Sequence, residues 1–170
     1  MGTIFVDNLE PQSGTSLTLG ASGDAINLAT GATAGFGKIG QVIEATNASM
    51  TTNITSTSYV ATGLTANITP SSTSSKVFVL INFAATMDGG SNGTLGFGAI
   101  YNGTSTNVRE RLTVYDTDFG NVGNPCSIQA LHSPNSTSQQ TYNLYVKTLN
   151  SSSQFRPNGE GTIILMEVLA

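Results

Sequence analysis

The sequence has no tryptophan, a single cysteine and few charged side chains. Only 9% of its 170 residues are Asp, Glu, Lys or Arg, against roughly 25% in an ordinary globular domain. The lone Cys126 excludes a disulfide framework and argues against a cysteine-based metal site. The six cations are scattered along the chain and the net charge is −4. Because nucleic-acid binding depends on a basic patch, we expect no nucleic-acid partner.

Long apolar runs are also missing. No stretch approaches the roughly 20 apolar residues of a membrane-spanning helix, so we expect no membrane insertion. The first ten residues, MGTIFVDNLE, lack the basic and apolar regions of a secretory signal. We therefore expect a protein that is made in a cytoplasm and stays soluble.

What the sequence has instead is period-two alternation of apolar residues, the pattern typical of β-strands. The apolar residues, 38% of the chain, lie in short runs between turns rich in Ser, Thr, Asn and Gly. Strands are expected at residues 39–45, 58–69, 77–85, 94–101, 108–115, 126–132, 142–149 and 162–169. Eight strands at this spacing predict an all-β fold. Residues 39–170 should form one domain, an antiparallel β-sandwich of jelly-roll type.

Two of these strands are apolar on both faces. VFVLINFAA, residues 77–85, alternates between two apolar sides, and TIILMEVL, residues 162–169, is a continuous β-favouring run. Strands of this composition are usually covered on both faces. We expect the first to be central and covered on two sides, and the second to be buried.

Two glycines share one face of the strand TLGFGAIY, residues 94–101. Glycine weakens a strand unless another group must approach closely. At Gly96 and Gly98 two explanations stay open. Either the chain packs tightly against itself there, with a ring or a bulge, or a neighbouring subunit presses against a flat surface.

Residues 1–38 have a different character. LTLGASGD and INLATGAT form a degenerate repeat, in which two apolar residues precede a turn of small residues. A short-stranded, glycine-rich segment of this kind cannot build a core and gains stability by packing on neighbours. We expect an attachment and oligomerisation segment, a disordered tail being the alternative. Its apolar contact residues would be Phe5, Val6, Leu9, Leu17, Leu19, Ile26 and Leu28.

Three stretches resemble structural and tail-fibre-like proteins of marine tailed bacteriophages, including cyanophages. They are FVDNLEPQSGTSLTLGASGDAINLATGATAGFG, STSYVATGLTANITPSSTSSKVFVLINFAA and the terminal GTIILMEVLA. The resemblance is strong over residues 5–40 and 57–85 and weak over 94–160. It implies a β-rich, trimeric virion protein without enzymatic activity.

Catalytic patterns are sparse. His132 is the single histidine, and no Gly-x-Ser-x-Gly elbow accompanies it. Asp116 and Asp118, in the stretch YDTDFGN, are weak candidates for Ca²⁺ ligands, because the later acidic ligand of a calcium loop is missing. We therefore predict no enzyme, no cofactor and no metal site.

One strand carries candidate binding residues. Arg109, Arg111 and Tyr115 share a face, and Phe119 follows in the next loop. Two guanidinium groups beside a phenol could hold an anionic sugar or a phosphate. Alternatively, the arginines pair with carboxylates of the same or a neighbouring chain. The carboxylates considered are those of Glu44, Glu160 and Glu167. Glu110 points to the opposite, apolar side and is expected near a subunit interface, with a partner.

Together these patterns predict a non-enzymatic virion structural protein, a homotrimeric tail fibre or head fibre. Its N-terminal segment would bind other virion proteins. A capsid decoration protein and a module that binds host-surface glycans are the alternatives. A polysaccharide depolymerase, which would need paired carboxylates, ranks last.

Overall fold

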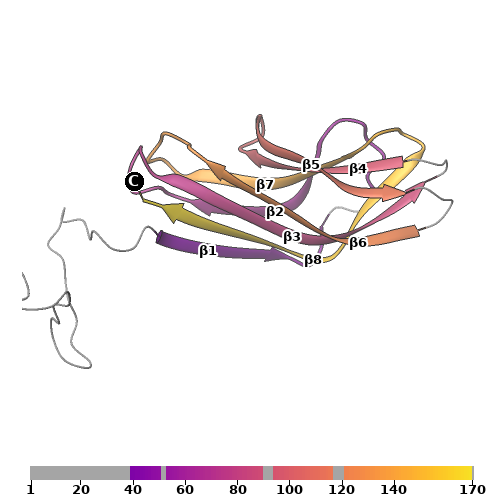
Figure 1. Ribbon diagram of the computed structural model, residues 1–170, viewed down its shortest axis with the longest axis horizontal. Coiled ribbons are helices and arrows are strands. Elements are labelled where there is room, and N and C mark those ends of the chain that lie inside the picture. The colour runs from indigo at the N-terminus through magenta and orange to yellow at the C-terminus, as the bar shows by residue number, and fades with distance from the viewer. Residues whose placement is uncertain (1–38, 51–52, 90–93, 117–120, 170) are drawn as a thin grey trace, which may run out of the picture. The chain divides into compact units, whose positions relative to one another are not determined.

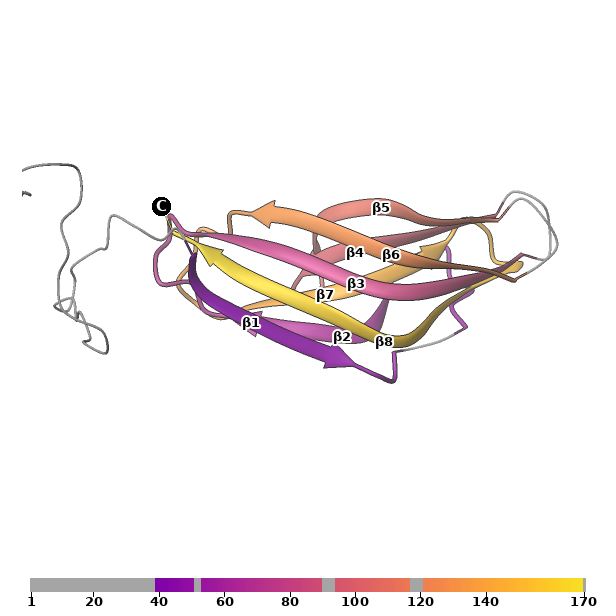
Figure 2. The same cartoon turned by 60° about the horizontal axis from the view of Figure 1, so that its bottom comes forward.

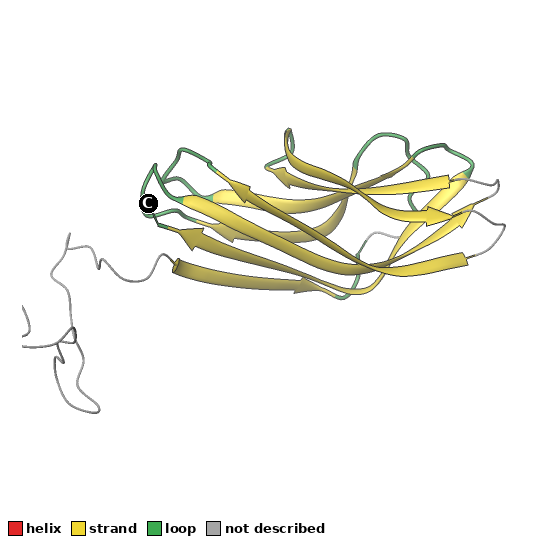
Figure 3. Cartoon of the chain, in the orientation of Figure 1, coloured by secondary structure: helices red, strands yellow, loops and turns green. Residues whose placement is uncertain are grey.

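The computed structural model describes residues 39–50, 53–89, 94–116 and 121–169, and all regular structure in these ranges is β-strand (Figure 3). Within them there is no helix that could cross a membrane. The predicted attachment segment, residues 1–38, lies outside the described residues. The strands are β1 (Ile39–Asn47), β2 (Val60–Ile68), β3 (Lys76–Gly89), β4 (Thr94–Asn102), β5 (Thr106–Asp116), β6 (Asn121–His132), β7 (Gln140–Thr148) and β8 (Ser153–Val168).

The eight strands form two antiparallel sheets packed face to face (Figure 1). The first sheet has the order β1-β8-β3-β6 and the second β2-β7-β4-β5. The first four strands therefore pair with the last four in reverse order: β1 with β8, β2 with β7, β3 with β6 and β4 with β5. A long hairpin wrapped into two sheets in this way is a jelly roll. The predicted fold is confirmed, including its jelly-roll type.

The core lies between the sheets and is built by every second residue of each strand. In β3 the inward residues Val77, Val79 and Ile81 are fully buried, and in β8 Ile163 and Leu165 are. Burying a side chain of this size contributes roughly 1.5–3 kcal/mol. The period-two pattern of the sequence thus reflects one buried side for each sheet.

All eight predicted strands are present, but three are longer than expected. β3 continues to Gly89, β6 begins at Asn121 and β8 begins at Ser153, inside stretches predicted to be loops. There Asn121 pairs with Asp88, and Ser153 pairs with Gly89. These polar strand ends are held in the sheet by main-chain hydrogen bonds. Main-chain bonds do not require apolar side chains, so the ends show no apolar alternation in the sequence.

The predicted cover on both sides of β3 is found on one side only among the described residues. β3 is central, between β8 and β6, as expected, but no described element covers its outer side (Figure 2). Phe78 and Leu80 of β3 are half-buried on that side, as are Ile164 and Met166 of β8. A two-layer sandwich leaves each sheet with one free face. Apolar residues on both sides of these strands therefore do not mean that the chain itself buries both sides.

Of the two explanations left open for Gly96 and Gly98, the structure supports tight packing of the chain against itself. A Cβ atom at Gly96 would overlap the ring of Phe155, and one at Gly98 would lie 2.5 Å from Cδ1 of Ile128. Phe155 and Ile128 are fully buried. The glycines therefore face the core and make room for large side chains of the first sheet.

Candidate functional site

The outer side of the second sheet carries aromatic side chains around one lysine, and we call this cluster the tyrosine face. It consists of Tyr59, directly before β2, Phe97 and Tyr101 of β4, and Tyr145 and Lys147 of β7. All five side chains are partly exposed. Since β4 and β7 are neighbours in the sheet, residues far apart in the sequence meet on one surface.

The tyrosine face follows from the alternation of inward and outward side chains along β7. Tyr142, Leu144 and Val146 point inward and are fully buried, so Tyr145 and Lys147 must point outward. The strand expected at residues 142–149 is thus confirmed, with every second residue buried and the others partly exposed.

The rings of the tyrosine face are in contact. Tyr101 and Tyr145 stack with ring centroids 4.4 Å apart and planes inclined by 28°. Tyr59 lies tilted against Tyr101, with centroids 5.6 Å apart. Offset and tilted pairs of this kind contribute roughly 0.5–1.5 kcal/mol beyond the area that they bury. The result is a continuous aromatic surface across three strands of the sheet.

Lys147 contacts both the aromatic rings of the tyrosine face and the carboxylate of Glu110. Its Nζ lies 4.4 Å from the ring centroid of Tyr59 and 5.1 Å from that of Phe97, both within the range of cation–π attraction. The same atom lies 3.4 Å from Oε1 of Glu110. The charge of the lysine is thus balanced within the cluster, and the surface as a whole is close to neutral.

Tyr59 supplies a buried hydroxyl group beside Glu110. Its Oη forms no hydrogen bond of normal length among the described residues. Burial raises the pKa of Tyr59 far above its usual value, and the Glu110 carboxylate raises it further, as a more distant hydrogen-bond acceptor and as a negative charge. The group therefore stays protonated at every physiological pH.

Amide and hydroxyl groups border the aromatic surface. Asn143 lies opposite Tyr101 in register and donates a hydrogen bond from Nδ2 to the Gly103 carbonyl at 2.9 Å. Beyond it, Oγ1 of Thr141 donates to Oδ1 of Asn67 at 2.7 Å. Ring faces beside fixed amides suit a neutral sugar, whose apolar ring face stacks while its hydroxyls form hydrogen bonds.

The predicted binding residues lie at the edge of this sheet. Arg109 and Arg111 are exposed on the edge strand β5, opposite Ile100 and Gly98 of β4. Neither belongs to the ion pairs found among the described residues, which are Lys147–Glu110 and Arg156–Asp88. An anion site at the two arginines stays a prediction, as does their pairing with a neighbouring chain.

The expectation for Glu110 needs a correction. Glu110 lies opposite Ala99 on the outer side of the sheet, and its partner is Lys147 of the same chain. Val114, which simple alternation along the strand would put on the same side as Glu110, is instead buried in the core opposite Gly96. A register shift between the pairs of Gly96 and Phe97 separates the two residues, because a bulge moves the following side chains to the other face.

Several predicted residues cannot be placed. Phe119 and Asp118 lie outside the described residues, and the side chains of Tyr115 and Asp116 are not described either. The same holds for the seven apolar residues assigned to the attachment segment. In the ranges that the structure describes, no three His, Cys, Asp or Glu side chains come together as metal ligands would.

His132 and Cys126 have structural surroundings. Nδ1 of His132 lies 2.8 Å from the hydroxyl oxygen of the buried Tyr142, and burial lowers the pKa of the histidine. Burial also raises the pKa of the Cys126 thiol to about 11. The two residues are six positions apart on β6, too far for one to activate the other.

Glu167 is the one buried acid of the described region, and its environment was not foreseen. Oε1 accepts hydrogen bonds of 2.6 Å from both the backbone nitrogen and Oγ of Ser71, and Oε2 accepts one of 2.8 Å from Nε2 of Gln41. Desolvation raises the pKa of Glu167, but these hydrogen bonds outweigh it and lower the pKa to about 2. The carboxylate joins β8, β1 and the β2–β3 loop at one end of the sandwich.

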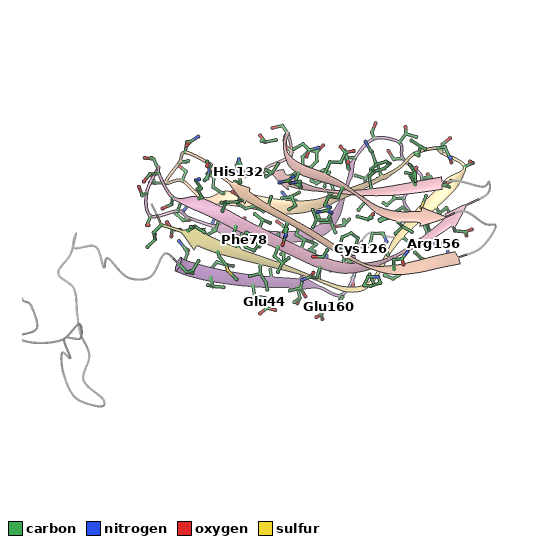
Figure 4. All side chains as sticks on the ribbon, in the orientation of Figure 1. Glu44, Phe78, Cys126, His132, Arg156 and Glu160 are labelled. Atoms are coloured by element: carbon green, nitrogen blue, oxygen red, sulfur yellow. The ribbon has the colours of Figure 1, made fainter. Side chains whose placement is uncertain are left out.

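The outer side of the first sheet is apolar over much of its area, and we call this surface the apolar face. Figure 4 shows Glu44 and Glu160 on the same side, pointing away from the second sheet. Three of the apolar side chains, Ile39, Val42 and Leu131, are about half exposed. The apolar face consists of Ile39, Val42, Phe78, Leu80, Leu131, Ile164, Met166 and Val168.

A shallow, open hollow lies on the same sheet beyond the apolar face, where the register between β3 and β8 shifts after Asn82. Its only acidic lining residue is Glu160, and it brings no second carboxylate or histidine beside it. It is lined by Asn82, Phe83, Ala84, Pro125, Cys126, Ser127, Glu160 and Thr162.

No protein-family model matches the sequence, and the curated proteins contain no match either. Solved structures of infectious bursal disease virus are similar to this chain in part. The Gx strain structure aligns with 85% of this chain at 13% identity and a TM-score of 0.44, and the Gt strain structure with 86% at 13% and 0.43. A crystal structure of the VP2 subviral particle aligns with 76% at 14% and 0.42. The alignments cover 42%, 42% and 38% of the viral chains, so this chain spans about two fifths of their length.

Proposed function

We propose that this chain is a non-enzymatic structural protein of a bacteriophage virion. It assembles as a homotrimeric tail fibre or head fibre, and residues 1–38 attach it to other virion proteins. The observation that carries this proposal is the apolar face, which no described element of the chain covers (Figure 2). Apolar surfaces of this kind mark sites of association, and the jelly roll is a common fold of viral capsid domains. The resemblance to phage structural proteins supplies the virion context.

The distribution of reactive groups among the described residues supports the proposal of a non-enzymatic protein. An active site brings a nucleophile, a base or paired carboxylates together in one cavity. In the described part of the chain, His132 bonds to Tyr142, Glu110 to Lys147 and Glu167 to Ser71. Each group is engaged in a structural contact, and the hollow beside Glu160 gathers none of them.

Native mass spectrometry of the full chain tests the assembly. We expect a trimer that persists at physiological salt, because burial of apolar surface is insensitive to screening. Antibody labelling of intact particles then shows whether the trimer sits on the tail or the head, or coats the capsid as a decoration protein. A stable monomer that labels no particle would contradict the proposal.

A second function is favoured by the tyrosine face: binding of a host-surface glycan. Stacked rings bordered by amides, with a balanced charge, match a neutral sugar better than an anionic one. In this second proposal the sugar lies on the flat outer side of the second sheet. The exposed arginines of β5 would favour an anionic sugar instead.

A pair of variants separates these two sugar sites. On an array of neutral and anionic bacterial glycans, Tyr145→Ala is expected to weaken binding about tenfold, since it removes one stacking ring. The double variant Arg109→Ala with Arg111→Ala should bind as the wild type does. Circular dichroism of both variants checks that the fold is kept. Binding that is lost with the arginines and kept without Tyr145 would move the site to β5.

A further inference from the structure

The apolar face is organised in rows that run across all four strands of the first sheet. Val42 of β1 pairs with Met166 of β8, Met166 with Phe78 of β3, and Phe78 with Leu131 of β6. Residues directly opposite each other in a ladder point to the same side. These four side chains therefore form one unbroken apolar row from one edge of the sheet to the other.

The neighbouring rows of paired residues on either side define the extent of the apolar face. Toward the start of β1, Ile39 pairs with Val168, which pairs with Lys76. In the other direction, Ile164 and Leu80 continue the apolar surface across β8 and β3. Four strands about 4.8 Å apart and three rows about 7 Å apart span roughly 400 Å², including the polar positions of Glu44 and Lys76 at the ends. The largest apolar patch of a typical monomer covers roughly 300–600 Å² and is often functional.

The most exposed members of the full row lie at opposite edges of the sheet. Val42 is 56% exposed and Leu131 53%, whereas Phe78 and Met166 between them are half-buried. β1 and β6 are the edge strands. A partner must therefore cover both edges as well as the middle of the face.

We propose that the apolar face packs against the apolar faces of two further copies of this chain around a threefold axis. The β1 edge of each copy meets the β6 edge of the next, so that Val42 contacts Leu131 of the neighbouring copy. The proposal rests on the trimeric assembly put forward above and names the surface that forms it.

The dimensions of the sheet fit this arrangement. Three sheets, each about 15–20 Å wide, enclose a triangular prism whose sides lie roughly 4–6 Å from the axis at their midpoints. Phe78 and Met166 occupy these midpoints, and side chains of their length reach that far. They fill the axis, while the edge residues meet at the corners.

The charges at the edges fit as well. Glu44 on the β1 edge lies in the same row as Gln129 on the β6 edge, through Ile164 and Leu80. Around the axis, each Glu44 carboxylate comes to lie beside a Gln129 amide rather than beside another carboxylate. The amide can donate a hydrogen bond to it, and no like charges meet at the corners.

Disulfide trapping in the full chain tests the contact. Cys126 is buried, so the unmodified chain should form no cross-link on oxidation. The double variant Val42→Cys with Leu131→Cys should form a covalent trimer on a non-reducing gel, and each single variant should stay uncross-linked. A product that stops at the dimer indicates a twofold pair and overturns the threefold arrangement. Cross-linked single variants, or no cross-link in the double variant, overturn it too.

A charge placed on the face gives a second measurement. Leu131→Glu should convert the trimer to monomers in native mass spectrometry, because the carboxylate would be buried beside Val42 without a counter-charge. The matched control, Thr65→Glu, places the same charge on an exposed site of the second sheet and should remain trimeric. If both variants stay trimeric, the trimer stands but the apolar face does not form it. If the unmodified chain is a monomer, the trimeric assembly itself is wrong.

Discussion

Substituting Gly96 by alanine is expected to destabilise the sandwich by about 3 kcal/mol, the upper part of the range for overpacked cores. The added methyl group would overlap the ring of Phe155. That ring cannot move away easily, because Phe155 is fully buried and its backbone N and O each bond to Ile54 at 2.8 Å. Met87, which pairs with Phe155 in the ladder and whose Sδ lies 3.5 Å from the same Cβ position, is also fully buried.

Thermal unfolding monitored by circular dichroism measures this effect. A domain of about 130 residues loses roughly 3–5 °C in Tm for each kcal/mol, so Gly96→Ala should lower Tm by roughly 10 °C. Gly123→Ala is the matched control, since a Cβ atom there meets nothing within 4 Å and the backbone is not left-handed. Its Tm should change by no more than about 2 °C.

A double variant identifies the cause. Combining Gly96→Ala with Phe155→Leu makes room for the methyl group, so the combined loss should be smaller than the sum of the two single losses. Additive losses would mean that the glycine is needed for another reason, and the close approach to Phe155 would not be its explanation.

The sequence was sufficient for the strands and for the fold class, because each sheet buries one side and the buried side repeats every second residue. It was insufficient for the faces of β5. Two register shifts interrupt its pairing with β4, so Glu110 and Val114, which alternate correctly in the sequence, end on opposite sides of the sheet. A bulge changes the side of a residue without changing the pattern of apolar letters.

The tyrosine face could not have been found from the sequence. Tyr101 and Tyr145 stack because β4 and β7 are neighbours, and strand order is not encoded in alternation. Part of the apolar face could be predicted from the sequence, since both sides of the strand at residues 77–85 are apolar. The predicted cover on both sides of this strand stays a prediction, because a sequence does not tell whether the cover comes from the same chain or from another one.

Glu167 stands out in the sequence, because it is an acid at an inward position of an otherwise apolar strand. From the sequence, Glu167 was one of three carboxylates that could have paired with Arg109 or Arg111. Its actual partners, Gln41 and Ser71, are 126 and 96 residues away along the chain, and they are neutral donors. A buried carboxylate without a cation must be satisfied by hydrogen bonds, and short polar residues in loops are the natural source of them.

Replacing Glu167 by glutamine is therefore expected to destabilise the protein by roughly 3 kcal/mol at pH 7. A carboxyl group with a pKa of about 2 in the folded protein and 4.5 in the unfolded chain contributes roughly that free energy when it is ionised. The amide of the variant also turns a donor toward Ser71 or Gln41, which themselves donate. Glu160→Gln, an exposed position on the same strand, is the matched control and should change stability by less than about 0.5 kcal/mol.

The pH dependence of the free energy of unfolding shows whether Glu167 stabilises the protein through its negative charge or through the packing of its side chain. Because the folded pKa of Glu167 lies below the unfolded one, the unfolded chain binds more protons between these values, and stability rises with pH in that window. The contribution is complete above about pH 5 and is lost as the pH falls through about 2. In urea unfolding at several pH values, the difference between the wild type and Glu167→Gln should be constant from pH 7 to 5. It should then shrink steadily toward pH 2. A difference that stays constant down to pH 2 would mean that packing, and not the ionised carboxylate, holds β1 and the β2–β3 loop to β8.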